Sequence, residues 1–222
     1  MQPVAGLIIF DFDGTLGDTR RNIVDTLQDT MREVGLPVRD EASCAATIGL
    51  TLTDSFAALF PEITREQALA CTDAYRRIFE QNRLKHVPVA FPGTRETLAK
   101  LRERNFILTV ASSRSSRSLH MLLSEMGLEP YIDFIVGADD VQHPKPHPEP
   151  VLKTLEAMGV PADRTLVVGD MPVDILMGRG AGVHTCAVTY GNASREELEA
   201  AGADCIIDRI EDLPGAILNP GL

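Results

Sequence analysis

Two aspartates, one residue apart, stand directly after a short apolar run near the start of the chain. Residues 7–10 (LIIF) are followed by Asp11 and Asp13, and Asp18 adds a third carboxylate a few residues later. Carboxylates this close repel one another, and each of them prefers water. Their oxygens suit a hard divalent cation, and a carboxylate can also act as a nucleophile. The spacing therefore predicts a cation site, or carboxylate chemistry, at the end of a buried strand.

Further polar residues follow later apolar runs of the chain. They stand after residues 106–111 (FILTVA), within residues 143–148 (HPKPHP) and after residues 165–168 (TLVV): Ser112, Ser113, Arg114, Lys145, Asp170 and Asp174. Together they offer hydroxyls, fixed cations and carboxylates for a hard metal ion, beside the carboxylate nucleophile. This combination of groups is typical of phosphoryl transfer.

The elements that position these residues alternate between strands and helices in the second part of the chain. The sequence predicts helices over about 94–104, 116–126, 149–158 and 173–180, and strands over 106–111, within 134–140, over 165–170, around 183–188 and over 205–208. Repeated strand–helix units imply a parallel, Rossmann-like α/β sheet with helices on both faces. Ligands of such sheets bind beyond the carboxyl ends of the strands, so the polar residues should converge there.

Residues 18–87 have a different character, because their pattern is helical and includes no good strand. Apolar residues between Ile23 and Val34 recur on one helical face, and residues 64–67 (TREQ) match a capping box. We therefore predict a discontinuous core of residues 1–17 plus 88–222. A small all-helical cap of residues 18–87 is inserted after the first strand, with hinges near 14–17 and 88–93.

Composition limits the classes of function that the chain can have. The 222 residues are 44% hydrophobic and 24% charged, with a formal net charge of -11, which disfavours nucleic acid and anionic membranes as partners. The N-terminal apolar run is too short for a signal sequence or a membrane span. Four widely spaced cysteines without a CxxC pair indicate reduced thiols. We expect a cytoplasmic monomer or homodimer that acts on a small metabolite.

The motifs resemble those of haloacid dehalogenase (HAD) superfamily phosphatases over nearly the whole chain. Residues 11–18 (DFDGTLGD) match the first motif, and Ser112 matches the second. Lys145 matches the third motif in a K-P-x-P setting, and residues 169–174 (GDMPVD) match the fourth. The helical insertion is similar to the cap of the phosphoglycolate phosphatase and β-phosphoglucomutase branch. The resemblance implies a Mg²⁺-dependent phosphatase that acts on a small phosphorylated metabolite.

The resemblance also implies a role for each matched residue. Asp11 would attack phosphorus and form an aspartyl-phosphate, and Asp13 would act as general acid and then as general base. An Asp11 oxygen, the Asp13 backbone carbonyl and Asp170 would bind Mg²⁺. Ser112 and Lys145 would bind the phosphate oxygens.

Other residues of the motifs and of the cap are supporting candidates. Asp174 would hold a metal-bound water or Lys145. Ser113, Arg114, Gly49 and Thr53 are weaker candidates for substrate binding. Arg76 in the cap is interpreted as a solvated residue rather than as one that faces the substrate, and His143 and His147 are interpreted as loop residues without metal-ligand spacing.

Three alternatives stay open beside a phosphomonoesterase such as phosphoglycolate phosphatase. A mutase similar to β-phosphoglucomutase would carry a histidine five residues after Asp18, where this chain has Ile23. An inorganic pyrophosphatase belongs to the same branch. The intact motifs argue against the third alternative, a non-enzymatic binding protein. A true dehalogenase would lack the second carboxylate, so Asp13 argues against that activity.

Overall fold

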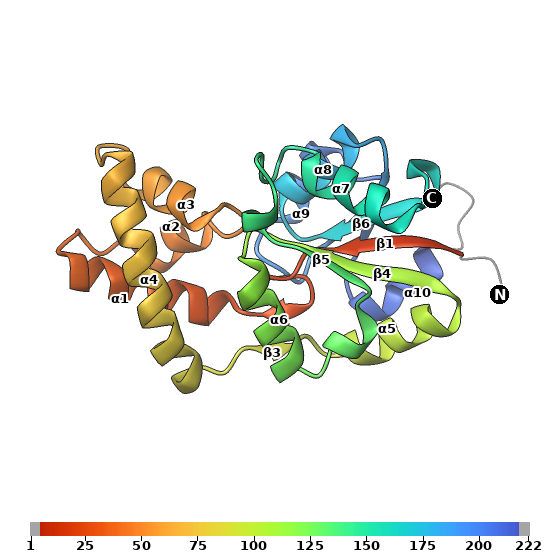
Figure 1. The fold of residues 1–222 in the computed structure, drawn as a ribbon, viewed down its shortest axis with the longest axis horizontal. Helices are drawn as coiled ribbons and strands as arrows, with labels where there is room; N and C mark the ends of the chain where they lie inside the picture. The colour runs from red at the N-terminus through yellow and green to blue at the C-terminus, as the bar shows by residue number, and fades with distance from the viewer. Residues whose placement is uncertain (1–4, 218–222) are drawn as a thin grey trace.

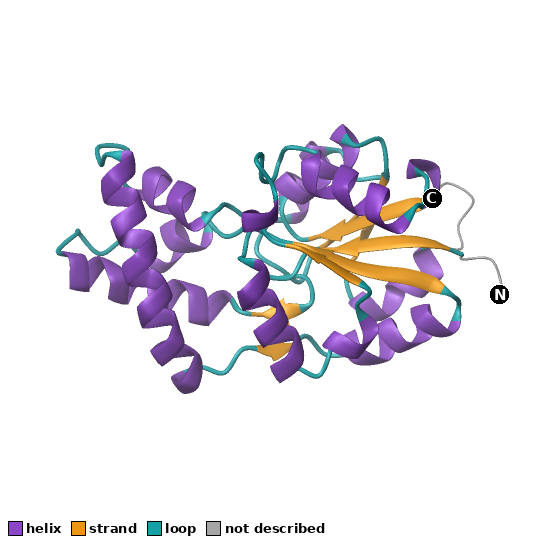
Figure 2. Ribbon diagram, in the orientation of Figure 1, coloured by secondary structure: helices purple, strands orange, loops and turns teal. Residues whose placement is uncertain are grey.

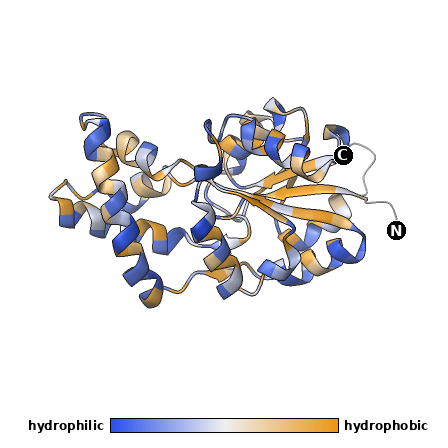
Figure 3. Ribbon diagram, in the orientation of Figure 1, coloured by the Kyte–Doolittle hydropathy of each residue, from blue (hydrophilic) through white to orange (hydrophobic). Residues whose placement is uncertain are grey.

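The computed structural model describes residues 5–217, and its centre is a six-stranded parallel sheet (Figures 1 and 2). The strand order is β5-β4-β1-β6-β7-β8. The strands are β1 (Gly6–Phe10), β4 (Phe106–Ala111), β5 (Phe134–Val136), β6 (Thr165–Gly169), β7 (His184–Val188) and β8 (Cys205–Ile207). The predicted Rossmann-like α/β fold is therefore confirmed, and Figure 3 shows that the strands are strongly apolar.

Helices cover both faces of the sheet (Figure 2). They are α5 (Thr94–Glu103), α6 (Ser116–Glu125), α7 (Glu149–Met158), α8 (Pro172–Gly180), α9 (Arg195–Ala201) and α10 (Leu213–Ala216). Successive residues of β1 point to opposite faces, so Ile8 and Phe10 join one apolar cluster, whereas Leu7 and Ile9 join another. Burial on both faces explains why this strand is apolar without alternation.

Four helices form a separate group at one end of the molecule (left in Figure 1). They are α1 (Arg20–Val34), α2 (Glu41–Ala45), α3 (Leu52–Leu59) and α4 (Arg65–Lys85). The capping box at the start of α4 is present, with Thr64 accepting from the Gln67 backbone and Gln67 from the Thr64 backbone. The insertion after β1 is therefore all-helical apart from its junction with the core.

The junction contains two short strands that the sequence does not reveal. β2 (Gly17–Asp18) and β3 (Val89–Ala90) pair antiparallel, so the chain leaves and re-enters the core side by side. The exact division into core and cap stays a prediction, and residues 1–4 and 218–222 of the predicted core lie outside the described residues. Within the described range, no helix combines the length and hydrophobicity that crossing a membrane requires.

Candidate active site

The first two aspartates lie at the carboxyl end of the central strand. β1 lies between β4 and β6 in the sheet, so the strand order reverses at β1. The chain segments that follow β1 and β6 therefore run to opposite sides, which leaves a crevice at the carboxyl ends of these two strands. The Asp11 backbone N–H donates to the carbonyl of Val168 over 2.8 Å, which fixes Asp11 directly beside the end of β6. The predicted convergence of the strand ends is therefore present for β1 and β6.

Lys145 is buried between two carboxylates. Its Nζ donates to Asp11 Oδ1 and to Asp174 Oδ1, each over 2.6 Å, and the three side chains are at most 6% exposed. Burial opposes the charged form of Lys145, but the two carboxylates outweigh it and raise the pKa of the amine. Burial raises the pKa of Asp11 well above its usual value, although Lys145 acts in the opposite direction.

Asp170 is held by the loops after β1 and β7. It accepts from Thr15 Oγ1 over 3.1 Å, from the Asn192 backbone over 2.7 Å and from Asn192 Nδ2 over 2.9 Å. Burial, and then the charge of Asp174, raise the pKa of Asp170 to about 7. Gly14 has φ +85°, and a Cβ there would lie 2.2 Å from Asp170 Oδ2, so glycine is required for this close approach.

Three of the carboxylates could hold a metal ion together. Oxygens of Asp11, Asp170 and Asp174 all lie within 4.8 Å of one another, and all three residues are buried. Lys145 is the cation beside them, so the group keeps an excess of negative charge when it is ionised. Oxygen ligands and excess negative charge fit a hard divalent cation.

The Asp13 side chain points to different partners. It accepts from Thr19 Oγ1 over 2.5 Å and from Arg114 Nε over 2.9 and 2.7 Å. The Arg114 guanidinium also lies over the ring of Phe79 in α4, with Cζ 5.1 Å from the ring centroid. Burial opposes the charge of Arg114, but Asp13 outweighs this and raises its pKa. Asp13 and Arg114 thus connect the sheet edge with the helical cap.

The residues after β4 also contact the cap. The Ser112 backbone donates to Val136 O over 3.0 Å, and Ser112 Oγ accepts from the Arg114 backbone over 3.3 Å. Ser113 Oγ donates to the Gly49 carbonyl over 2.5 Å, which joins the core to the loop before α3. The structure therefore brings Gly49 to the predicted phosphate-binding loop.

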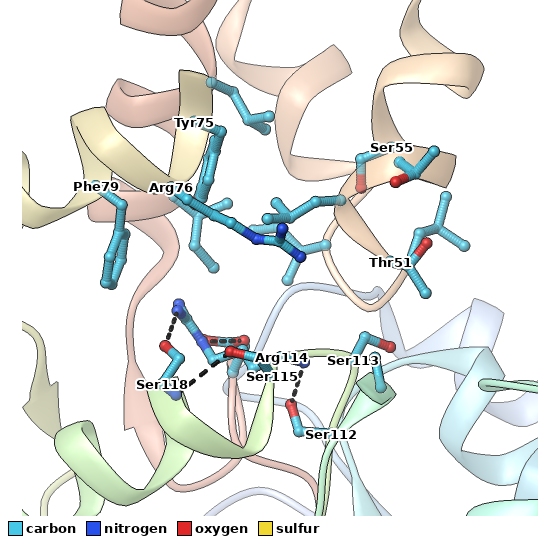
Figure 4. Close-up of a pocket in the computed structure, with 18 of the residues that line it drawn as sticks. Thr51, Ser55, Tyr75, Arg76, Phe79, Ser112, Ser113, Arg114, Ser115 and Ser118 are labelled. Carbon is cyan, nitrogen blue, oxygen red and sulfur yellow. Dashed lines mark hydrogen bonds and ion pairs between the residues drawn. The ribbon is translucent and has the colours of Figure 1, made fainter. Parts of the chain in front are cut away.

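A cavity of about 890 Å³ separates the sheet edge from the cap helices. Asp11, Asp13 and Ser112 line it from the core, and the loop and helices between residues 47 and 83 line it from the cap. Thr53 lies in this lining and contacts Thr72, with 3.2 Å between the hydroxyl oxygens. Figure 4 shows the loop from Ser112 to Ser115 facing α4 across the opening. The weaker candidates therefore lie around the same cavity as Asp11, Asp13 and Ser112, whereas Lys145 lies behind Asp11 and is not part of the lining.

Two histidines after η2 (Ala138–Asp140) form a second cluster with Glu149. Their ring centroids lie 4.6 Å apart, and His143 Nδ1 is 2.8 Å from Glu149 Oε2. Potential ligand atoms of His143, His147 and Glu149 lie within 4.8 Å of one another, so the interpretation that the histidines lack metal-ligand spacing is wrong. Both histidines are exposed, as expected for loop residues.

Sequence reasoning missed several residues of the site. Asn192 is not among the predicted residues, although it follows the apolar strand β7 at the same edge of the sheet, and this position is the signal that points to it. Tyr190 in the same loop donates to the carbonyl of Thr15 over 2.9 Å. Thr15 lies within the first motif, but no role was given to its hydroxyl. The pairing of Arg114 with Asp13 joins residues 101 apart and has no local signal.

Comparison with known families agrees with this geometry. The sequence-family model named "Haloacid dehalogenase-like hydrolase" matches residues 8–188. This range includes the six candidate residues at the carboxyl ends of the strands, from Asp11 to Asp174. This chain belongs to that family. The HAD-type fold and its hydrolase class are thereby established for the chain, as the sequence motifs predict.

Several curated relatives match nearly the whole chain. "Probable phosphatase IndB" of Dickeya dadantii is 37% identical over 212 residues, covering 95% of this chain and 92% of that protein. "Pyrophosphatase PpaX" of Oceanobacillus iheyensis is 33% identical over 206 residues, covering 93% of this chain and 94% of that protein. A "Phosphoglycolate phosphatase" of Photorhabdus laumondii is 28% identical over 219 residues, covering 97% of this chain and 93% of that protein.

A solved structure has the same arrangement. The crystal structure titled as a predicted phosphatase from Clostridium acetobutylicum has a TM-score of 0.88 and 26% identity, and the match covers 97% of this chain and 99% of that one. The fold of this HAD hydrolase, helical cap included, is therefore shared along the full length of a related protein.

Proposed function

We propose that this HAD hydrolase removes the phosphoryl group from small phosphorylated metabolites, with Asp11 as nucleophile and Mg²⁺ as cofactor. The observation that carries the proposal is the position of Asp11. Its carboxylate lies at the carboxyl end of β1, is 2.6 Å from Lys145, belongs to a group of three buried carboxylates and lines the large cavity. A nucleophile, a fixed cation and a metal-binding group therefore meet where a phosphate can enter.

The proposed reaction has two steps, and the contacts of these residues support it. An Asp11 oxygen attacks phosphorus, the bond from phosphorus to the ester oxygen breaks, and Asp13 protonates the departing oxygen. Water then attacks the aspartyl-phosphate, Asp13 takes up a proton from it, and Asp11 is released with inorganic phosphate. Lys145 and Ser112 bind the phosphate oxygens. Arg114 and Thr19 hold the Asp13 carboxylate at the cavity.

Asp11 and Asp170, together with the Asp13 backbone carbonyl, would hold Mg²⁺. Asp174 would support the site, because it already binds Lys145 and accepts from the Met171 backbone over 3.1 Å. The ion would neutralise the carboxylates and the charge on the phosphate oxygens. Thr15 and Asn192 keep the Asp170 side chain in place, as second partners of a metal ligand commonly do.

Pyrophosphate hydrolysis is the second candidate. It is favoured by the 33% identity to a relative named as a pyrophosphatase, whereas phosphoglycolate hydrolysis is favoured by the more distant relative named as a phosphoglycolate phosphatase. A phosphosugar mutase has less support, because Ile23 is buried in α1 where a mutase-type histidine would stand.

Phosphate release from a panel of small esters and pyrophosphate, with Mg²⁺ and with EDTA, tests the proposal. We expect metal-dependent release, and loss of activity in Asp11→Asn with an unchanged circular dichroism spectrum. Release that persists in Asp11→Asn would remove Asp11 as the nucleophile. No release from any substrate would refute the phosphatase function.

A further inference from the structure

Five arginines line the cavity around and above the catalytic centre. Five acidic residues line it as well, namely Asp11 and Asp13 of the catalytic centre and the residues at positions 73, 80 and 139. The arginines are Arg76, Arg77, Arg83, Arg114 and Arg117. The formal charges of this lining therefore balance, whereas the chain as a whole carries a formal net charge of -11. An arginine of this lining that is only weakly paired with a carboxylate is available to a ligand that is anionic beyond its transferred phosphate.

Three of these arginines are already engaged. Arg77 forms an ion pair with an acidic residue of α1, and Arg83 forms ion pairs with acidic residues of α4 and α6. Arg114 binds both carboxylate oxygens of Asp13 through its Nε. These contacts account for the guanidinium groups of Arg77 and Arg83, whereas Arg114 keeps one buried nitrogen, Nη2, without a hydrogen-bond partner among the described residues.

Arg76 differs from them because its guanidinium extends from α4 into the cavity. Figure 4 shows it crossing the space above Arg114 and Ser113, so that it faces the loop from Ser112 to Ser115. Its ion pair with Asp73, one turn earlier, has an N–O distance of 3.3 Å, and the two side chains are 64% and 78% exposed. Such an exposed pair contributes little, so Arg76 can exchange Asp73 for a ligand at low cost.

The surroundings of Arg76 are suited to a compact anion. A guanidinium presents a planar fork of N–H donors that matches a carboxylate or a phosphate. The hydroxyls of Thr51, Ser55 and Ser113 lie around the same cavity (Figure 4). Each of them already donates to a protein oxygen, so the Arg76 guanidinium is the group that would bind the anion. Arg117, on the first turn of α6, also lines the cavity and makes neither an ion pair nor a hydrogen bond with the described residues, so it adds unneutralised positive charge.

We propose that Arg76 binds a second anionic group on the part of the substrate that leaves. The preferred substrates are then small phosphate esters or anhydrides that carry two anionic groups, the second being a carboxylate or another phosphate. The inference rests on the proposed phosphatase function, and it assigns the selection of the leaving group to a residue of the cap.

Matched substrates test this role. 2-Phosphoglycolate carries a carboxylate where 2-hydroxyethyl phosphate carries a neutral CH₂OH group. Pyrophosphate carries a second phosphate as its second anionic group. We expect Arg76→Met, which keeps an apolar stem, to lower kcat/KM for the substrates with two anionic groups by roughly 10–100-fold. It should change kcat/KM for 2-hydroxyethyl phosphate by less than about 3-fold. Arg76→Lys should recover part of the loss, because it restores charge without the fork.

Arg65→Met is the matched control, since Arg65 is exposed on the same helix and does not line the cavity. It should leave the preference unchanged. Binding of 2-phosphoglycolate to Asp11→Asn, with and without Arg76→Met, gives a readout without turnover. Comparing the carboxylate and the pyrophosphate arms shows which second anion is selected.

The outcomes separate the two proposals. Equal losses for charged and neutral leaving groups, or no loss in Arg76→Met, would overturn the role of Arg76 while the phosphatase function stands. Absence of phosphate release from every substrate would refute the phosphatase function. In that case, weaker binding of 2-phosphoglycolate in the Arg76→Met background would still support the anion site, and unchanged binding would overturn it.

Discussion

Replacing Lys145 by methionine should destabilise the metal-free protein strongly at pH 8. The amine lies 2.6 Å from both Asp11 and Asp174, and the side chains of all three are nearly inaccessible to solvent. Removing one partner of a buried ion pair costs about 3–5 kcal/mol of the free energy of unfolding. An independent estimate is similar, because two like charges 4 Å apart repel by about 4 kcal/mol at an effective dielectric constant of 20.

The loss should depend on pH, because the remaining carboxylates can take up protons. The pKa of Asp170 is raised to about 7 and that of Asp11 is also raised, so at pH 5 the group can become partly neutral. The repulsion then falls, and the cost of Lys145→Met should drop to about 1–2 kcal/mol, the value of the lost hydrogen bonds. Lys145 itself stays charged over this range, since its pKa is raised.

Chemical denaturation in EDTA, followed by circular dichroism because the chain has no tryptophan, measures this difference at both pH values. Lys100→Met is the control, since Lys100 is exposed on α5 and should change the free energy of unfolding by less than about 0.5 kcal/mol. Adding Asp174→Asn to Lys145→Met should restore part of the stability, because it removes one unpaired charge. A pH-independent loss, or a loss no larger than that of Lys100→Met, would refute this reasoning.

Two further predictions concern the acid–base residue and the metal. Asp13→Asn should lower kcat by about 10²–10⁴-fold; a near-normal steady-state rate would exclude Asp13 as general acid. Burial raises the pKa of Asp170 to about 7, so the folded metal-free protein binds more protons than the unfolded chain and loses stability as pH rises from about 4 to about 7. Because a metal needs the ionised carboxylates, Mg²⁺ should raise Tm more at pH 8 than at pH 5; equal shifts in thermal melts at the two pH values would contradict this.

The sequence predicts the core elements well because local patterns determine them. The strand over residues 106–111 and the helix over 149–158 are present with the predicted bounds, and the capping box of residues 64–67 forms. The candidates at the ends of β1 and β6 come together because parallel strands bring their carboxyl ends to one edge. Family membership and hydrolase class could likewise be predicted, since each motif is a short local stretch and the motifs occur in the order that the family has.

The parts that the sequence does not predict depend on contacts between distant residues. β2 and β3 have two residues each, so no periodicity marks them, and α2 has only five residues. Arg114 is attractive as an anion ligand on local grounds, but its Nε is taken by Asp13, 101 positions earlier. Conversely, the exposure of Arg76 agrees with a solvated residue, and its place in the cavity depends on how α4 is packed over the sheet edge.

The same carboxylates that suit this site to a cation oppose its folding without one. Asp11, Asp170 and Asp174 are buried within 4.8 Å of one another, and burial raises the pKa of Asp11 and Asp170, so their ionised forms are disfavoured. Lys145 offsets part of this cost, while Thr15 and Asn192 keep the Asp170 oxygens hydrogen-bonded. Because Lys145 must also be free to bind phosphate in the proposed reaction, it cannot neutralise the group alone. A divalent cation would then stabilise the fold and at the same time release Lys145 for the substrate.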